Sequence, residues 1–271
     1  MPCVRPLAVS AGARDLLACG APQLRASYEH GASLAIDGFD EDIFLSAPGR
    51  GLLPLHIVVR ECDLCSILEA ARCAGLTPPL RFDLRNVRIF SSRLIPDPAS
   101  MRSDRALSNI AALGQWLRAH PAPLGFGKPA GEWLAKGGPV EHWVAALREV
   151  SPAGEQALLA LIGRGAGSTP AGDDFLIGML AQAWASSGEQ APLAALLRAL
   201  RGRLPQLTTT ASVSYLRAAL RGEFGSHLVV LVRSLAHVTF PRVLALAARV
   251  AGHGVSSGLD TLAGFIAASE A

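Results

Sequence analysis

The sequence predicts an α+β protein, with a β-rich lobe over residues 1–98 and a helical lobe over residues 99–271. Three observations predict this division. Short β-compatible segments, separated by glycine and proline, fill the first part of the chain. From Val140 onward, apolar residues recur at helical spacing almost to the end. Between the two patterns, Pro96-Asp97-Pro98 breaks the strand sequence, and a chain of 271 residues is long enough to bury two cores.

The first lobe is predicted to be mostly strands with one helix. His30 and His56 fall in predicted strands, where a structural role is favoured over a ligand role. The helix is expected over residues 63–74, and the strands over residues 25–30, 32–37, 42–47, 54–60, 80–84 and 87–90.

The second lobe is predicted to be a helical bundle. Ile110, Leu113 and Leu117 mark one face of a helix that ends near Pro121. The Pro- and Gly-rich segment 121–138 that follows is either a lid or a surface excursion, and its irregular composition favours the latter. Further on, core faces are marked by Leu193, Leu196, Leu197, Leu200 and Leu204, and by Leu228, Leu231, Val232 and Leu235.

Composition narrows the class of protein. Half of the residues are hydrophobic and 17% are charged, which predicts an apolar surface for a partner, either the chain itself or other subunits. The net charge of +3 comes from scattered arginines without a basic run, so a nucleic acid partner is not expected. The longest apolar stretch, residues 175–185, is too short to cross a bilayer. With no signal-peptide pattern, the chain is expected to be cytoplasmic.

The glycine loop, residues 163–174, is the strongest functional signal, and it leads straight into an apolar helix. Its glycines supply positive φ angles and a bare backbone that a ligand can approach. Amides at the start of a helix suit an anion, whereas Asp173 and Asp174 suit Mg²⁺ or a substrate amide. Acidic residues also stabilise the first turn of a helix, so a purely structural role stays open.

Two further polar clusters begin helices in the same lobe. In the first, Thr208, Ser212 and Tyr215 are spaced to share one helical face, although helix capping is an equal alternative. The second is the glycine- and serine-rich segment 252–264. Its residues 257–264, Ser-Gly-Leu-Asp-Thr-Leu-Ala-Gly, align with residues 171–178, Ala-Gly-Asp-Asp-Phe-Leu-Ile-Gly. The match pairs Asp174 with Asp260 and predicts two helix N-termini that face one pocket.

These three clusters resemble a bacterial family that includes the AllH-type subunit of oxamate carbamoyltransferase. The family motif Gly-x-Gly-x-Gly-x-Thr-Pro-x-Gly-Asp-Asp is carried by residues 163–174, with Ala166 and Ser168 where Pro and Leu are expected. Thr208, Thr209 and Ser212 carry the Thr-Thr-x-x-Ser pattern, and Ser257, Gly258 and Asp260 carry the late Ser-Gly-x-Asp pattern. The motifs cover only the last part of the chain.

The resemblance implies a part in purine and allantoin degradation, where a complex of several subunits exchanges oxalurate and phosphate with oxamate and carbamoyl phosphate. The ligand would be small, anionic and amide-bearing. Its oxygens would take the loop amides, and the carboxylates of Asp174 and Asp260 would accept from its NH₂ group. The candidate catalytic residues are Asp174, Asp260 and His253. The candidate ligand-binding residues are Gly165, Gly167, Thr169, Gly172, Asp173, Thr208, Thr209, Ser212, Ser257 and Gly258.

Two other functions stay open at the level of sequence. One is a non-catalytic scaffold whose glycine loops only build the bundle. The other is a Mg²⁺-dependent hydrolase that uses Asp173, Asp174 and Asp260 as oxygen ligands. No cofactor is identified by the sequence, and Mg²⁺ is the one that these carboxylates would suit.

Overall fold

The computed structural model describes residues 3–49, 51–74 and 79–270 and confirms the α+β class, with a six-stranded sheet followed by a helical region. The chain divides into two compact units, Met1–Ser92 and Arg93–Ala271. The segment Pro96-Asp97-Pro98 lies at the start of the second unit, where the Asp97 side chain caps a short helix by accepting from the Ser100 amide at 3.0 Å.

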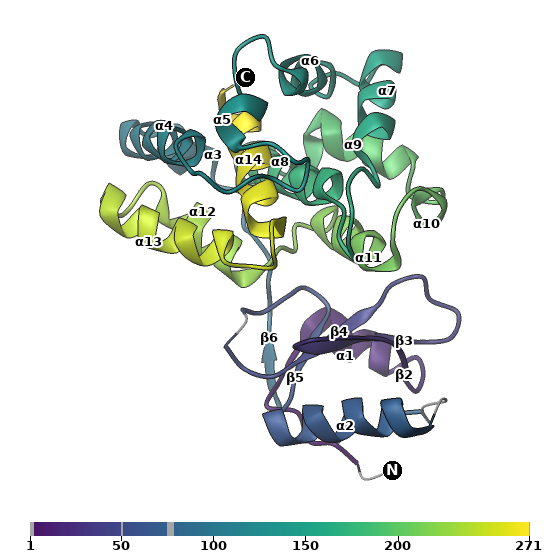
Figure 1. The fold of residues 1–271 in the computed structure, drawn as a ribbon. Coiled ribbons are helices and arrows are strands. Elements are labelled where there is room, and N and C mark those ends of the chain that lie inside the picture. The colour runs from purple at the N-terminus through teal and green to yellow at the C-terminus, as the bar shows by residue number, and fades with distance from the viewer. Residues whose placement is uncertain (1–2, 50, 75–78, 271) are drawn as a thin grey trace. The chain divides into compact units, whose positions relative to one another are not determined.

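The first unit is a mixed sheet in the order β2-β3-β4-β5-β1-β6 (Figure 1). Neighbouring strands are antiparallel except β4 with β5 and β1 with β6, which are parallel. The strands are β1 (Ala8–Ser10), β2 (Gln23–Tyr28), β3 (Gly31–Ala35), β4 (Ile43–Ser46), β5 (His56–Val58) and β6 (Arg88–Phe90), and the helices are α1 (Ala11–Leu17) and α2 (Glu61–Ala74).

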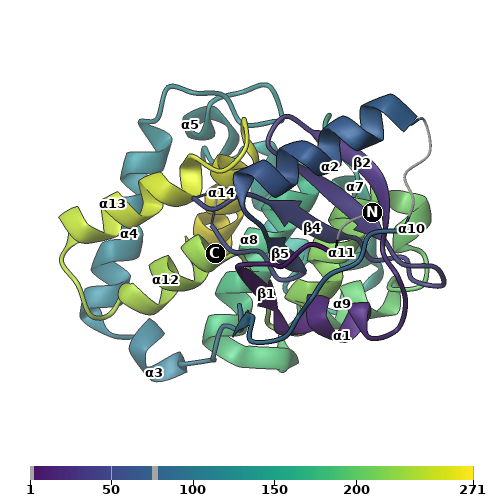
Figure 2. The same ribbon diagram turned by 90° about the horizontal axis from the view of Figure 1, so that it is seen from below.

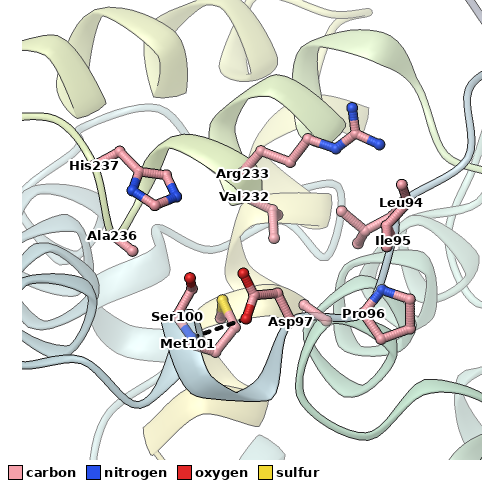
Figure 3. Close-up of a pocket in the computed structure, with 11 residues that line it drawn as sticks. Leu94, Ile95, Pro96, Asp97, Ser100, Met101, Val232, Arg233, Ala236 and His237 are labelled. Carbon is pink, nitrogen blue, oxygen red and sulfur yellow. Dashed lines mark hydrogen bonds between the residues drawn. The ribbon is translucent and has the colours of Figure 1, made fainter.

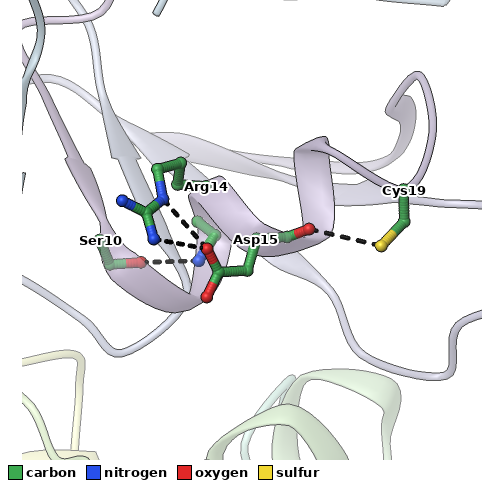
Figure 4. A network of polar contacts seen from close by, with 5 residues as sticks. Ser10, Arg14, Asp15 and Cys19 are labelled. Atoms are coloured by element: carbon green, nitrogen blue, oxygen red, sulfur yellow. Dashed lines mark hydrogen bonds and ion pairs between the residues drawn. The ribbon is translucent and has the colours of Figure 1, made fainter.

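Ser10 connects β1 to the helix that follows it. Its hydroxyl caps α1 by accepting from the Ala13 amide at 3.1 Å (Figure 4) and also accepts from the His56 amide at 3.0 Å. The prediction missed β1 and α1, because each is too short to show a periodic pattern. Residues 80–84 were predicted as a strand but form only an isolated bridge between Phe82 and Val4.

His56 has the structural role that its strand position favoured. The residue is buried, its Nδ1 accepts from the Leu53 amide at 3.2 Å, and its Nε2 lies 2.9 Å from the Ser46 hydroxyl. Because Nδ1 is the acceptor, Nε2 carries the hydrogen and donates to Ser46. The ring therefore cannot take a proton from that serine.

The second unit is the predicted helical bundle, built around α8 and α14. Its core side chains all come from residues 94–267, separate from the core of the sheet. In Figure 1 and Figure 2, α12 and α13 lie side by side. The helices are α3 (Pro98–Met101), α4 (Asp104–Arg118), α5 (Ala130–Trp133), α6 (Pro139–Ala146), α7 (Pro152–Leu161), α8 (Ala171–Ser187), α9 (Pro192–Ala199), α10 (Leu204–Leu207), α11 (Thr210–Ala219), α12 (Ser226–Ser234), α13 (Phe240–Ala251) and α14 (Ser257–Glu270), with a 3₁₀ turn at Gly188–Gln190.

Helices α8 and α14 cross at two glycines that the internal match had aligned. A Cβ on Gly178 would lie 1.9 Å from the Thr261 carbonyl oxygen, and a Cβ on Gly264 would lie 1.9 Å from that of Phe175. Each glycine thus rests on the backbone of the other helix, at a distance that any side chain would prevent. This reciprocal contact sets where the N-termini of the two helices lie.

None of the helices in the described residues combines the length and the apolar character needed to cross a membrane.

Candidate functional site

The glycine loop connects α7 to α8, and its glycines have two different roles. Gly163, Gly165 and Gly167 adopt φ angles of 71°, 116° and 98°, which side chains disfavour. Gly172 lies instead in the first turn of α8, where an added Cβ would come within 1.9 Å of the Leu161 carbonyl oxygen. The first three glycines shape the loop, and the fourth packs α8 against the end of α7.

The middle of the loop presents free backbone donors. Residues 164–168 are exposed, and the amides of residues 165–169 donate no hydrogen bond to any described residue. The amide of Gly172, by contrast, donates to the Arg164 carbonyl at 2.8 Å. The predicted backbone donors therefore lie at Gly165, Gly167 and Thr169 and not at Gly172.

Asp173 holds the loop in place. Its carboxylate accepts from the Gly163 amide at 2.9 Å and from the Thr208 hydroxyl, and the side chain is fully buried. Burial raises the pKa of Asp173, while the hydroxyls of Thr208 and Ser212 and the Gly163 amide counteract that rise. The Gly163 contact closes the loop onto α8, and the Thr208 contact joins α8 to the segment between α10 and α11.

The hydroxyl cluster, which is the first polar cluster and contains Thr208, Thr209 and Ser212, is arranged differently from the prediction. Thr208 does not share a helical face with Ser212 and Tyr215, because it is extended and α11 begins only at Thr210. Thr209 is the N-cap of α11. Its side-chain oxygen accepts from the Ser212 amide at 3.2 Å, and its hydroxyl donates to the Ser168 carbonyl at 2.6 Å. The Thr209 side chain therefore both caps α11 and attaches the glycine loop to it.

The N-termini of α8 and α14 meet at a pair of carboxyl groups. The hydroxyls of Thr169 and Ser257 are 3.0 Å apart. Burial raises the pKa of Asp174 well above its usual value, the nearby charges of Asp260 and Asp173 raise it further, and the hydroxyls of Ser257 and Thr169 oppose the rise. The structure thus brings together Thr169 and Asp174 of the glycine loop with Ser257 and Asp260 of the segment 252–264. The sequence predicted all four as site residues.

Asp174 has an unsatisfied oxygen. The residue is 6% exposed, and its Oδ2 is buried without a hydrogen-bond partner among the described residues. A buried acceptor without a partner costs about 1–3 kcal/mol. Such an atom marks a position where a ligand hydrogen bond would recover free energy.

Asp260 binds a backbone group that the sequence analysis missed. The Gly125 amide donates to both of its carboxylate oxygens, at 3.0 and 3.3 Å. Burial raises the pKa of Asp260 to about 6, against the opposing effect of the Ser256 hydroxyl and the Gly125 amide. A Cβ on Gly125 would lie 2.8 Å from the Ser256 hydroxyl oxygen and 2.9 Å from Asp260 Oδ2, so only glycine fits.

The segment 121–138, which carries Gly125, was expected to be a surface excursion, but part of it packs into the core of the second unit. Leu124, Ala130 and Trp133 are buried, and Phe126 stacks on Trp133 with ring centroids 4.4 Å apart. Hydrogen bonds from the Leu124 amide to the Lys128 carbonyl and from the Gly127 amide to the Leu124 carbonyl, both 2.8 Å, close a tight turn. The Gly-Phe-Gly sequence at 125–127 was the available signal for a contact of this kind.

His253 and Gly258 shape the turn between α13 and α14. The His253 amide donates to the Val250 carbonyl, and its carbonyl accepts from the Gly258 amide, both at 3.0 Å. Gly258 packs closely, because an added Cβ would be 1.8 Å from the Val250 carbonyl oxygen. These contacts give both residues a structural role, and a catalytic role for His253 stays a prediction.

Among residues 3–49, 51–74 and 79–270, no three His, Cys, Asp or Glu side chains are grouped so that they could hold a metal ion. Two of the three aspartates of the hydrolase alternative, Asp173 and Asp260, already accept backbone amides. The donor set expected for Mg²⁺ therefore does not fit this arrangement.

A cavity of about 370 Å³ lies elsewhere in the second unit and includes none of the predicted site residues. Its walls are mostly apolar, and Asp97, Ser100, Arg233 and His237 add polar groups (Figure 3). The polar groups are partly engaged, since the Asp97 carboxylate accepts from the Ser100 amide and Arg233 donates to the Arg93 carbonyl at 2.9 Å.

Residues 161–269 match the model of the family described as oxamate carbamoyltransferase subunit AllH. The match confirms the resemblance that the motifs indicated, and its range holds the glycine loop, the hydroxyl cluster and the α13–α14 turn. Gly125 and the whole of the first unit lie outside it. No solved structure matches the chain.

Proposed function

We propose, from the similarity of residues 161–269 to the AllH subunit family, that this chain is a subunit of a carbamoyl-transfer complex and binds a small anionic, amide-bearing ligand. The reaction would be that of the family name, the exchange of oxalurate and phosphate with oxamate and carbamoyl phosphate, in purine and allantoin degradation. The observation that carries the proposal is the buried Oδ2 of Asp174, which has no partner among the described residues.

The contacts suggest a division of roles within the site. The amides of residues 165–169 would bind the anionic oxygens of the ligand, since unpaired amides at the start of a helix attract anions. Asp174, Thr169 and Ser257 would also contact the ligand. Asp173 and Asp260 would act as positioning residues, because their carboxylates already hold the Gly163 and Gly125 amides.

A scaffold function explains the glycines but not the polar groups. A protein that only needed a tight helix crossing would gain nothing from the buried, unpartnered Oδ2 of Asp174, because an unsatisfied polar atom lowers stability. The hydrolase alternative lacks a metal-binding group among the described residues. Ligand binding is therefore the function that these side chains support best.

Partner subunits are part of the proposal. Large apolar side chains are exposed at several positions of the second unit, namely Ile95, Leu107, Val150, Val230 and Val255. Contact with other subunits of the complex, or with a second copy of this chain, would cover such side chains. We also propose a cytoplasmic location, where small metabolites of this kind are processed.

Asp174→Ala tests the site directly. Removal of the carboxyl group should weaken binding of oxamate or carbamoyl phosphate on the order of tenfold to a hundredfold, because it deletes a buried hydrogen bond to a charged ligand. Calorimetry on the isolated chain measures binding. Carbamoyl phosphate formation from oxalurate and phosphate by the reconstituted complex measures activity.

The matched control is Asp104→Ala, which removes an exposed aspartate from the first turn of α4. This variant should bind like the wild type. If Asp174→Ala folds normally and keeps both binding and activity, the loop is architectural and the scaffold function is correct.

A further inference from the structure

The negative charge of three buried carboxyl groups is unfavourable for the binding of an anionic ligand, and the proposed function does not explain how this charge is reduced. Asp173, Asp174 and Asp260 are all buried, and the groups that set their pKa values include hydroxyls, backbone amides and other carboxylates but no Lys, Arg or His. Three ionised carboxylates without a cation would repel each other and any anionic ligand. At least one of them must be neutral for an anion to bind.

Among the groups that set the pKa of Asp174, no basic side chain of the surrounding segments is present to neutralise the carboxylates. Arg164, in the glycine loop, is exposed, and its guanidinium lies over the Trp143 ring, 5.4 Å from the centroid. Lys128, three residues after Gly125, lies 3.5 Å from the Glu132 carboxylate, and His253 is in the α13–α14 turn. The groups facing Asp174 are Asp173 on its own helix, Asp260 on α14, and the hydroxyls of Thr169 and Ser257.

The hydrogen bonds of the three aspartates differ, and this difference bears on which carboxyl group is neutral. Asp173 accepts from an amide and a hydroxyl, and Asp260 accepts from the Gly125 amide through both oxygens. Hydrogen bonds donated to a carboxylate favour its charged form. For Asp174 the described residues supply only the hydroxyls of Ser257 and Thr169 and no backbone donor, and its Oδ2 is buried without a partner among them. A proton on Oδ2 would remove the repulsion between Asp174 and its two neighbours.

We propose that Asp174 is a neutral carboxylic acid in the ligand-free site and donates the hydrogen on Oδ2 to an oxygen of an anionic ligand. This inference rests on the proposed function and deepens it. The ligand class is a small carboxylate or phosphoryl anion, held by loop amides on one side and by the Asp174 hydroxyl group on the other. Asp174 thus recognises the oxygen end of the ligand, and not an NH₂ group as the sequence analysis expected.

Infrared difference spectroscopy on the ligand-free full-length chain tests the protonation state. A protonated carboxyl group has a carbonyl stretch that a carboxylate lacks. At neutral pH the wild type should show this band, Asp174→Asn should lack it, and Asp260→Asn should keep it. If the band is absent from the wild type, or is lost in Asp260→Asn and kept in Asp174→Asn, the inference is wrong.

Oxamate binding across pH supplies the second test. Oxamate stays a monoanion over the working range, so its own ionisation does not interfere. Wild-type affinity should be constant at low pH and fall about tenfold per pH unit once Asp174 loses its proton. Asp174→Asn keeps a hydrogen-bond donor at this position and should retain only the weaker pH dependence that ionisation of Asp260, with a pKa of about 6, causes. A wild-type affinity that rises with pH would overturn the inference.

The two tests separate this inference from the proposed function. If oxamate, phosphate and carbamoyl phosphate do not bind to any variant, the proposed function fails while the infrared band still decides the state of Asp174. If they bind but the band is absent, the function stands and Asp174 is an ordinary carboxylate.

Discussion

Asp260 is one of three buried aspartates with a raised pKa, and it contributes to the pH dependence of folding stability. Its pKa is raised from 3.8 to about 6, so the folded state holds a proton that the unfolded chain releases between these values. Stability should therefore fall as pH rises from about 4 to about 6, by on the order of 2–3 kcal/mol, and this contribution should be constant above pH 6.

The measurement is the free energy of unfolding, by denaturant titration at several pH values, for the wild type and Asp260→Asn. The asparagine variant should lose less stability over this range than the wild type, because only the contributions of Asp173 and Asp174 remain. Asp104→Asn, at an exposed position, should follow the wild type. Parallel curves for Asp260→Asn and the wild type would mean that Asp260 titrates as an exposed aspartate does.

Gly125 is the residue at which a small change should have a large effect on the site. Gly125→Ala places a methyl group 2.8 Å from Ala171 Cβ and 2.9 Å from Asp260 Oδ2, so the turn must move and its hydrogen bonds to Asp260 must lengthen. We expect a loss of about 1–3 kcal/mol in stability and weaker oxamate binding by calorimetry.

Gly252→Ala is the matched control, because its added Cβ would meet no atom closer than 3.4 Å. If Gly125→Ala binds oxamate as tightly as Gly252→Ala does, the turn at residues 124–128 has no part in the ligand site.

At the scale of elements, the crossing of α8 and α14 is among the least tolerant contacts of the second unit. Gly178→Ala would bring a methyl group within 1.9 Å of the Thr261 carbonyl oxygen, and the helices must separate to accept it. The expected loss is on the order of 3 kcal/mol, measured by thermal or denaturant unfolding.

Gly264→Ala should cost a similar amount, because its contact with Phe175 is equivalent. Gly202→Ala, where an added Cβ meets nothing within 4 Å, should be close to neutral. Equal stability of all three variants would show that the helices cross less closely than described.

The sequence predicted the parts of the site that depend on local geometry. Glycines at 163, 165 and 167 have positive φ, and the short internal match correctly paired Gly178 with Gly264. Such features are encoded within a few residues. The Gly125–Asp260 contact joins positions 135 residues apart, and nothing in either local pattern identifies the partner. Thr208 was misplaced because moving a helix start by two residues changes which side chains share a face.

At the scale of the whole molecule, the two hydrophobic cores contain no shared residue. Among the described residues, the hydrogen-bond partners of Asp173 and Asp260, including Gly125, also lie within residues 93–271. We therefore expect a fragment of residues 93–271 to unfold cooperatively on heating and to bind oxamate with the affinity of the full chain. A fragment that lacks a cooperative transition would show that the second unit depends on the first for stability.

The crossing of α8 and α14 also has a consequence for biosynthesis. During translation α8 leaves the ribosome well before α14, so the face of α8 around Gly178 lacks its contact with α14 until residues 257–270 have been made. An apolar helix without its partner is prone to aggregate, and a contact so distant in sequence forms slowly. The nascent chain should therefore need chaperone protection during this interval, and ribosomes that stall before residue 257 should release a product that cells degrade.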